Sequence, residues 1–426
     1  MQLEAGVARE IITPKVGAML SGYLPARPCE SINDDLTATA AIFRQGEEII
    51  VLLSVTVLDV PFELTSELRS SIGGELGISP TKVIVSASHT HSGPSTRYDD
   101  FYGPPDMEYI NNVFKTRCLK AAKDAFKNLR PVKAGIGETE SNVGINRRKV
   151  LLDGSIVLGH NPWGLFDSRM TVLSFCGNDS IPYLNIIHYG AHTNGAGINK
   201  EVTRDWPGVM TDRLEKETGA LTIYLQGAEG DVAARIAING RDTYHKDRSL
   251  SQTLELGGLA GIDAARAWRN IKDYRDMELR TAEGDICIPY EPLWPLEIIK
   301  RKLTQTEESR YAHTYKTIEK LHEKRENKAG CFDFHQTLFC IGHAVFVPFP
   351  FEVFSEISLR LRDYSPYQHT LLMGVTNGSA SYLPTKRELA GGGYEADCFY
   401  WENPYRLPDD MDTRIINENL KIIKAL

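Results

Sequence analysis

Strand-like apolar runs that alternate with helix-like segments limit the folds open to this chain more than any other feature. Residues 37–60, TATAAIFRQGEEIIVLLSVTVLDV, predict two strands joined by a tight turn. Residues 61–78 predict a helix that ends at Gly77, and residues 82–93, KVIVSASHTHSG, predict the next strand. This order of elements is typical of an α/β fold with a mixed sheet core flanked by helices.

The rest of the chain continues the mixed order of helices and strands. We predict a helix over 108–129 and further strands over 132–140, within 171–192 and within 332–349. The charged, helix-favouring residues 290–330 predict an inserted helical pair or lid. No internal repeat or low-complexity linker interrupts the sequence, so we expect one domain over residues 1–426.

Composition excludes several classes of protein. The chain has 48 Lys and Arg against 56 Asp and Glu, a formal net charge of −8, which argues against a nucleic-acid partner. No apolar run approaches the ~20 residues of a membrane-spanning helix, so we expect no transmembrane segment. The amino terminus lacks a basic start followed by an apolar core, so we expect no signal peptide and a cytoplasmic location.

The cysteine pattern argues against a cysteine-based site. Seven cysteines are scattered along the chain without a C-x-x-C motif. We therefore expect buried free thiols rather than a disulfide framework or a cysteine zinc site, and any metal ion must have other ligands.

His89 and His91 lie where a predicted strand gives way to a Gly-Pro turn. In a strand, residues i and i+2 face the same side, so we expect the two imidazoles to project together. Such a pair can bind a metal ion or a substrate. An isolated H-x-H is equally compatible with ordinary hydrogen bonding, so further ligands are needed to favour a metal.

Two later strand ends supply such ligands. His188 and His192 end the run YLNIIHYGAH, and His192, nearer the turn, is the better candidate. Glu352 follows a β-like run and precedes a predicted helix, with Glu356 one turn later. Imidazoles from separate strand ends, joined by a carboxylate, form a set that zinc accepts with one position open. Alone, an acid at a helix start is more often a partner of the helix dipole.

Six short motifs occur in a specific order along the chain. They are SASHTHSGP, GINRRKV, AHTNGAGINKEVTRDWPG, LQGAEGDV, PFPFEVFSEISLRLR and TNGSASYLPTKRELAGGGYE. This ordered set resembles the neutral/alkaline (non-lysosomal) ceramidase family, from AGVAREIITP near the amino terminus to about Glu395. The resemblance implies a catalytic domain that holds zinc in a pocket built by strand-end loops.

The resemblance also implies a ligand set. In the family, zinc is held by the first histidine of H-T-H-S-G, a histidine on a later strand, a glutamate and a tyrosine. The corresponding residues here are His89, His192, Glu352 and Tyr382. Tyr382 rests on the resemblance alone, since a tyrosine in SYLP otherwise indicates a packed aromatic side chain.

The same resemblance implies residues of a substrate pocket. His91 and Arg147 would donate to a carbonyl oxygen as it gains charge, and Tyr394 would orient the leaving group. Gly22 would allow close approach of substrate or backbone, although an ordinary turn glycine is equally compatible. Asp205 in TRDWPG either supports a ligand histidine or caps a helix.

The chain departs from the family pattern at several points. Ala233 in GDVAAR stands where the family has a serine in G-D-x-S-P-N. Alanine cannot attack a carbonyl, so either metal-activated water performs the hydrolysis or the substrate differs from ceramide. The sequence ends soon after the tyrosine motif, so we expect no carboxy-terminal immunoglobulin-like domain. The segment PLWPLEIIKRKL is compatible with a lipid-facing element or with a helix packed on the protein itself.

We therefore predict a zinc-dependent amidohydrolase that cleaves an N-acyl bond of a small-molecule or lipid-like substrate by metal-activated water. Two alternatives stay open. One is a hydrolase of a small soluble amide, ester or sugar-derived compound, which would have a short, polar pocket. The other is a non-catalytic protein that retains the metal for ligand binding. The sequence makes no prediction of the oligomeric state.

Overall fold

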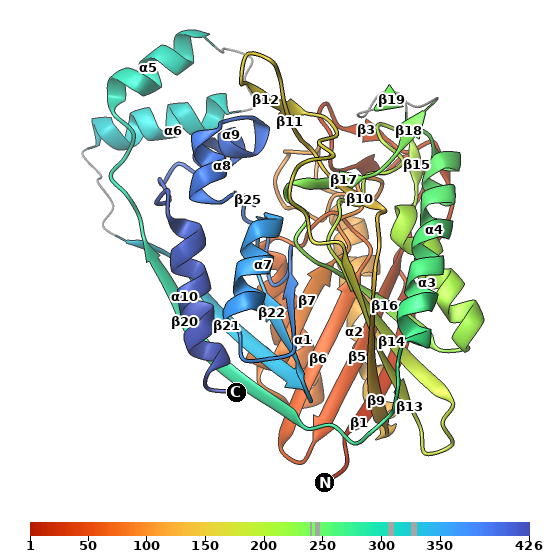
Figure 1. Cartoon of the computed structure of the whole chain (residues 1–426). Helices are drawn as coiled ribbons and strands as arrows, with labels where there is room; N and C mark the ends of the chain where they lie inside the picture. Colours follow the sequence, from red (N-terminus) through yellow and green to blue (C-terminus); the bar gives the residue numbers. More distant parts are fainter. Residues whose placement is uncertain (239–240, 243–247, 306–310, 325–329) are drawn as a thin grey trace.

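Three sheets enclose a shared apolar core in the computed structural model (Figure 1). The structure describes residues 1–238, 241–242, 248–305, 311–324 and 330–426. The first sheet has the order β7-β6-β5-β1-β8 and contains β1 (Glu4–Ile11), β5 (Thr37–Gln45), β6 (Glu48–Val55), β7 (Val83–Ala87) and β8 (Arg130–Pro131). The predicted strands, their turn and the mixed α/β single-domain class are confirmed.

The other two sheets pack against the first. The second has the order β16-β14-β13-β9, with β9 (Lys133–Glu140), β13 (Arg169–Cys176), β14 (Pro182–Tyr189) and β16 (Leu221–Gln226). The third has the order β20-β21-β22-β24, with β20 (Leu279–Pro289), β21 (Cys331–Ile341), β22 (Ala344–Pro348) and β24 (His369–Met373). Each of the three sheets has antiparallel pairings and one parallel pairing, which is β6 with β7, β14 with β16 or β22 with β24.

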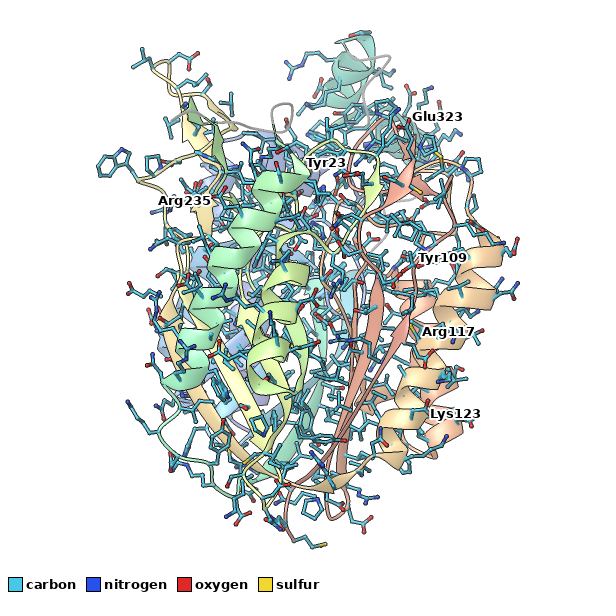
Figure 2. All side chains as sticks on the ribbon, turned by 90° about the vertical axis from the view of Figure 1, so that its right-hand side faces the viewer. Tyr23, Tyr109, Arg117, Lys123, Arg235 and Glu323 are labelled. Carbon is cyan, nitrogen blue, oxygen red and sulfur yellow. A yellow bond between two sulfur atoms is a disulfide. The ribbon has the colours of Figure 1, made fainter. Side chains whose placement is uncertain are left out.

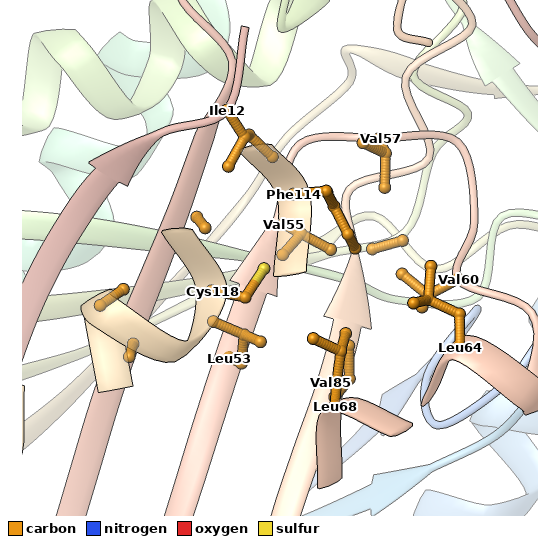
Figure 3. Close-up of a cluster of buried hydrophobic side chains, with 14 of the residues drawn as sticks. Ile12, Leu53, Val55, Val57, Val60, Leu64, Leu68, Val85, Phe114 and Cys118 are labelled. Carbon is orange, nitrogen blue, oxygen red and sulfur yellow. The ribbon is translucent and has the colours of Figure 1, made fainter. Parts of the chain in front are cut away.

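Alternating side chains explain how a strand such as β5 is buried on both faces. Ala41 and Phe43 point into the core between the sheets, whereas Ala40 and Ile42 face the covering helices. Figure 3 shows the helix side of this arrangement, where Leu53 and other strand residues pack against helical side chains. This double burial requires the near-continuous apolar runs seen in the sequence.

Helices cover the outer faces of the sheets. They are α1 (Phe62–Leu76), η1 (Pro80–Lys82), the π-helical η2 (Tyr109–Lys115), α2 (Thr116–Lys127), α3 (Asp205–Thr218), α4 (Leu250–Arg269), α5 (Leu296–Gln305), α6 (Ala312–Glu323), α7 (Ser355–Tyr364), α8 (Lys386–Ala390), α9 (Tyr394–Trp401) and α10 (Met411–Ile423). Helix α1 ends as predicted, because Gly77 adopts the left-handed conformation that closes it. Figure 2 shows Arg117 and Lys123 of α2 on the outer surface.

Short strand pairs gather at the end of the molecule opposite the two termini (Figure 1). They are β2 (Met19–Leu20) with β3 (Arg27–Pro28), β4 (Ser31–Ile32) with β15 (Glu201–Val202), β10 (Gly144–Asn146) with β17 (Val232–Ala234), β11 (Arg148–Val150) with β12 (Ile156–Leu158), β18 (Ala237–Ile238) with β19 (Arg241–Asp242), and β23 (Glu352–Val353) with β25 (Tyr382–Leu383). This end therefore has short, irregular segments on which functional side chains can be presented.

Helices α5 and α6 lie within the predicted helical segment 290–330, and the function of that segment as a lid stays a prediction. Its residue Trp294 packs on Trp401 with ring centroids 5.0 Å apart, and the guanidinium of Arg406 lies 4.3 Å from the Trp294 ring. This favours the packed-helix interpretation over a lipid-facing element. Within the described residues, no helix is both long and apolar enough to cross a membrane.

The prediction that all cysteines are free thiols is wrong for one pair. Cys287 of β20 forms a disulfide with Cys331 at the start of β21, with their Cα atoms 5.5 Å apart. The two strands are antiparallel neighbours, so residues 44 apart in sequence meet across the ladder. The other five cysteines are buried and take part in no disulfide, as predicted.

Candidate functional site

The two histidines of H-T-H come together, but not by strand alternation. Strand β7 ends at Ala87, and His89 adopts a left-handed backbone with φ of 64°. The predicted strand geometry is therefore wrong at this point, since His89 and His91 both lie beyond the end of β7. Their Nε2 atoms nevertheless lie 3.4 Å apart. A left-handed conformation is uncommon for a residue with a side chain, and it directs the His89 ring inward.

Backbone carbonyls fix the tautomers of His89 and His192. The Nδ1 of His89 lies 2.9 Å from the carbonyl oxygen of Leu58, and the Nδ1 of His192 lies 2.7 Å from that of Glu229. Because a carbonyl oxygen only accepts, each Nδ1 carries the proton, and the Nε2 of a neutral ring keeps its lone pair. Burial, together with the nearby charge of Arg147, lowers the pKa of His192 to about 3, so this ring is neutral at pH 7.

The carboxylate of Glu352 faces these two nitrogens. Its Oε2 lies 3.0 Å from the Nε2 of His192 and 3.5 Å from the Nε2 of His89. Buried lone pairs and a negative charge that face one another at this distance repel unless a cation lies between them. The arrangement fits a cation.

Tyr382 reaches the same place from another segment. It pairs with Glu352 in the short parallel ladder of β23 and β25, and its ring stacks on that of His192 with centroids 6.4 Å apart. Burial, and next the charge of Glu352, raise the pKa of the Tyr382 phenol well above its ordinary value. Tyr382 reaches the site because β25 pairs with β23, and the sequence around Tyr382 does not reveal this pairing. Only the resemblance to the family predicted this residue.

The buried histidine cluster, defined as His89, His91 and His192, could hold a metal ion. One ring nitrogen from each residue lies within 4.8 Å of the others, and all three residues are buried. With Glu352 and Tyr382 beside it, the cluster offers the nitrogen and oxygen donors that a transition metal accepts. More than one set of four donors is therefore available. One set is His89 and His192 with Glu352 and Tyr382, and in the others His91 takes the place of Glu352 or of Tyr382.

A pocket of about 330 Å³ opens above the histidine cluster. Its lining residues are Gly22, Tyr23, Leu24, His91, Phe101, Tyr102, Arg147, Leu158, Asn194, Tyr382 and Tyr394. All four residues that the resemblance implies for substrate binding therefore line one cavity, together with one implied metal ligand. Figure 2 shows Tyr23 toward the end of the molecule that carries the short strand pairs.

Arg147 is held rigidly at the pocket wall. Its Nε donates to an oxygen of Glu395 at 2.8 Å, and its guanidinium lies 5.3 Å from the centre of the Tyr382 ring. The other oxygen of Glu395 accepts from Arg148 at 2.7 Å. Both Arg147 and Glu395 are almost wholly buried. A buried arginine with a fixed partner can present its remaining N–H groups in a set direction.

Gly22 is a close-approach glycine rather than an ordinary turn glycine. Its φ is +94°, and a Cβ at this position would lie 2.6 Å from the His91 ring. The ring of Tyr23 also lies against this imidazole, with centroids 4.9 Å apart. The glycine therefore leaves room for the observed position of the His91 ring.

Asp205 supports the loop that carries the ligand histidine, and it is not the N-cap of α3, because Arg204 holds that position without a side-chain capping bond. Its carboxylate accepts from the backbone N–H groups of Gly195 and Ala196 at 3.0 and 2.8 Å, and from that of Trp206 at 2.7 Å. It thus ties the loop after His192 to the start of α3. The indole N–H of Trp206 also donates to the carbonyl oxygen of His192 at 3.0 Å. These bonds fix the backbone that carries the ligand histidine.

Two other candidates lie outside the cluster. The Nε2 of His188 lies 2.6 Å from the carbonyl oxygen of Leu372, within the sheet core. Glu356 pairs with Arg387 at 3.0 Å. The preference for His192 over His188 agrees with this geometry, and the helix-start acid that reaches the cluster is Glu352 rather than Glu356.

The chain is similar to known proteins in its fold. No protein-family model matches the chain, and no curated protein matches its sequence. Neutral ceramidase from Pseudomonas aeruginosa aligns with a TM-score of 0.75 and 16% identity, covering 100% of this chain and 75% of that one. A ceramidase complexed with C2 aligns with a TM-score of 0.77, the same identity and the same coverage. The chain has the neutral ceramidase fold.

The resemblance drawn from the motifs is thereby confirmed at the level of the fold. Ala233, which stands where the resemblance places a serine of the ceramidase family, lies in β17 and is fully buried. It pairs with Ile145 of β10. Its methyl side chain supplies no nucleophile.

Sequence reasoning missed three residues of this neutral ceramidase fold that contribute to the site. Asn194 lines the pocket, and its carbonyl and side-chain oxygens accept from the buried Arg248 at 2.9 and 3.1 Å. Glu395 holds Arg147. Glu229 is fully buried, and burial followed by the charge of Glu352 raises its pKa well above its ordinary value. The motifs AHTNG, GGGYE and LQGAEGDV carried these residues, but only tertiary contacts distinguish them from their neighbours.

Proposed function

We propose that the chain is a zinc-dependent hydrolase of N-acyl amides. The observation that carries this proposal is the set of inward-facing donors below the pocket, in which neutral imidazole nitrogens of His89 and His192 face the buried carboxylate of Glu352. A donor set beside a cavity of about 330 Å³, whose lining includes His91 and Tyr382, is the arrangement expected of a metal hydrolase.

We assign the metal ligands as His89, His192, Glu352 and Tyr382. Carbonyl oxygens hold both histidine rings with Nε2 toward the centre, which is the second hydrogen bond that ligand histidines usually make. A bound zinc ion supplies Lewis acidity and lowers the pKa of a coordinated water toward ~7. His91 is left to face the substrate, because it lines the cavity whereas His89 and His192 do not.

The pocket residues supply binding and charge stabilisation. Arg147, fixed by Glu395, is oriented to donate to the substrate carbonyl oxygen as that oxygen gains negative charge. His91 donates to the same oxygen, and Tyr394, which lines the same cavity, contacts the leaving group. With Ala233 in place of the family serine, the chain offers no hydroxyl nucleophile at this position, so water is the attacking group.

The pocket lining supports a lipid-like acyl chain over a small polar substrate. Leu24, Phe101, Tyr102 and Leu158 contribute apolar or aromatic surface around the polar centre. The volume, about 330 Å³, lies at the narrow end of ligand pockets, which suits one extended chain. A solved structure with this fold is described as neutral ceramidase, which agrees with an amide substrate of this kind.

Metal content measured by mass spectrometry tests the proposal. Wild-type protein and the variants His89→Ala, His192→Ala and His188→Ala are purified without added metal. We expect about one zinc per chain in wild type, loss in the first two variants, and retention in His188→Ala, whose ring bonds to Leu372 outside the cluster. Wild type without metal, even after zinc is supplied, would contradict the proposal.

A substrate panel then separates the candidate reactions. Zinc-loaded protein is assayed with N-acyl amides of short and long chains and with soluble esters. We expect hydrolysis of N-acyl amides with a preference for longer chains. Metal-loaded protein that turns over only small soluble esters would favour the soluble-substrate alternative, and inactivity on the whole panel would favour a binding protein.

A further inference from the structure

Six large apolar side chains are exposed within one short stretch of the chain. We call residues 150–165 the apolar segment; its exposed members are Val150, Leu151, Leu152, Val157, Trp163 and Leu165. Leu152 is fully exposed and Trp163 is 94% exposed. Single exposed apolar residues are common, but a cluster of this kind marks an interaction surface.

The turn at the tip of the β11–β12 hairpin presents Leu152 in a fixed geometry. The backbone N–H of Gly154 donates to the carbonyl oxygen of Leu151 at 2.9 Å, and that of Leu151 donates to Ser155 at 2.8 Å. Asp153 accepts from the backbone and hydroxyl of Ser155. A closed turn of this kind is usually polar, so a leucine at its tip is not explained by the turn itself.

The loop that carries Trp163 is equally well tied. Asn161 accepts from the Trp163 backbone N–H at 3.1 Å and donates to the carbonyl oxygen of Arg148 at 3.0 Å. Arg148, at the base of the hairpin, donates to Glu395 and to the carbonyl oxygen of Gly392 at 2.7 Å each. These hydrogen bonds fix the backbone that presents the exposed indole of Trp163.

The apolar segment adjoins the mouth of the pocket. Strand β11 begins directly after Arg147, and β12 ends at Leu158, and both residues line the cavity. Leu24 and Phe101, which also line the cavity, are each more than a third exposed. Figure 1 shows the hairpin at the end opposite both termini. Apolar surface thus continues from the hairpin to the cavity.

We propose that the apolar segment docks on the surface of a lipid bilayer, with Leu152 and Trp163 inserted among the lipids. This inference rests on the proposed function, because a lipid-like substrate must leave a bilayer to enter the pocket. Two projecting tips, rather than a flat or concave face, suit a deformable lipid surface. An indole with an apolar ring and a polar N–H prefers the membrane interface.

Charge indicates the kind of bilayer. Within residues 149–165, the exposed charged side chains are Lys149 and Asp153, which are opposite in sign. Arg148 is buried against acidic partners, so it adds no free positive charge. Binding therefore depends on apolar insertion rather than on anionic lipid headgroups, and it should change little with salt.

Flotation with vesicles of zwitterionic phosphatidylcholine tests the docking without any substrate. We expect wild-type protein to bind, and the double variant Leu152→Asp/Trp163→Asp to bind at least ~10-fold less, because two apolar insertions are lost. The matched control is Ile181→Asp/Tyr364→Asp. Ile181 and Tyr364 are also exposed, but they lie in the β13–β14 turn and at the end of α7.

Tryptophan fluorescence gives a second readout in the folded protein. Trp163 is the most exposed of the five tryptophans, since Trp206 and Trp401 are buried and the other two are partly buried. Brominated phosphatidylcholine should quench part of the wild-type emission, and Trp163→Phe should remove that quenching. Unchanged flotation of the double variant, or wild type that does not bind vesicles, would overturn the docking proposal.

Activity assays separate this proposal from the proposed function. The double variant should hydrolyse a soluble short-chain N-acyl amide like wild type but lose activity on the same head group carried by a vesicle-embedded long chain. Vesicle binding by a protein that hydrolyses nothing would retain docking and contradict the hydrolase. Hydrolysis without vesicle binding would retain the hydrolase and contradict docking. If wild type self-associates and the double variant does not, the apolar segment is a protein interface instead, which would also contradict docking.

Discussion

The histidine cluster and the apolar segment break the usual rule of burial in opposite directions. Around His192 and Glu352, polar atoms are buried, and backbone carbonyls hold the rings in place. Around Leu152 and Trp163, apolar side chains are exposed, and hydrogen bonds fix the backbone that presents them. In each region the surrounding structure maintains a locally unfavourable arrangement, which is expected at a functional site.

The two regions also differ in what the ligand must supply. The histidine cluster needs a positive charge, because its lone pairs and carboxylate face one another. The apolar segment needs an apolar environment and no particular charge. Variants in the first region should therefore change metal content and turnover, whereas variants in the second should change only how the substrate is reached.

The largest effect is expected for Glu352→Gln. An amide supplies no charge to balance a cation between the two imidazoles, so we expect loss of bound zinc and a fall in kcat/KM of at least about 10³-fold. Metal content and turnover are measured on the same preparation. His91→Ala is the comparison, and it should keep the metal while losing turnover; loss of zinc in His91→Ala would instead make His91 a ligand.

A smaller effect is expected for Glu395→Gln. This change weakens the bond that orients Arg147, and a misplaced donor at the reacting centre costs about 10²-fold in kcat. Metal content and KM should stay near wild type. Glu388→Gln is the matched control, because Glu388 pairs with Arg148 and not with Arg147. Equal losses in both variants would mean that Glu395 acts only through stability.

Gly22→Ala should lower kcat/KM by about 10-fold, since a methyl group at this position displaces the His91 ring and strains the backbone. Gly17→Ala separates the two causes. Gly17 has a φ of +98° like that of Gly22, but a Cβ there meets nothing within 4 Å. A similar loss in Gly17→Ala would show that His91 is not involved.

The smallest effect is expected at the pocket mouth. Phe101→Ser removes apolar contact from a residue that is 37% exposed, so KM for long-chain amides should rise only about threefold. Short-chain amides and metal content should be unaffected. A change in zinc stoichiometry would contradict the separation between the mouth and the histidine cluster.

Much of the fold could be predicted because its signals are local. The double-sided burial of β5 and β6 produces continuous apolar runs, and Gly77 marks the end of α1. The π-helical start of the second predicted helix has no comparable signal in the sequence. The Cys287–Cys331 disulfide was missed because it depends on the pairing of β20 with β21, which residue spacing does not reveal.

The candidate site was predicted in residue identity more than in geometry. His89 and His192 were found from their positions at strand ends. The left-handed turn at His89 follows from tertiary contacts such as the bond to Leu58, so strand alternation gave the wrong local structure. Tyr382 and Glu395 reach the site through pairing with distant segments, and no local pattern distinguishes them from packed or surface residues.

Anomalous diffraction at the zinc absorption edge, from crystals of the zinc-loaded protein, tests the central claim most directly. The account predicts one strong peak bonded to the Nε2 atoms of His89 and His192 and to Glu352, with His91 outside the coordination shell. The account would be contradicted by the absence of a peak in this pocket, or by a peak bonded to the three histidines with Glu352 turned away.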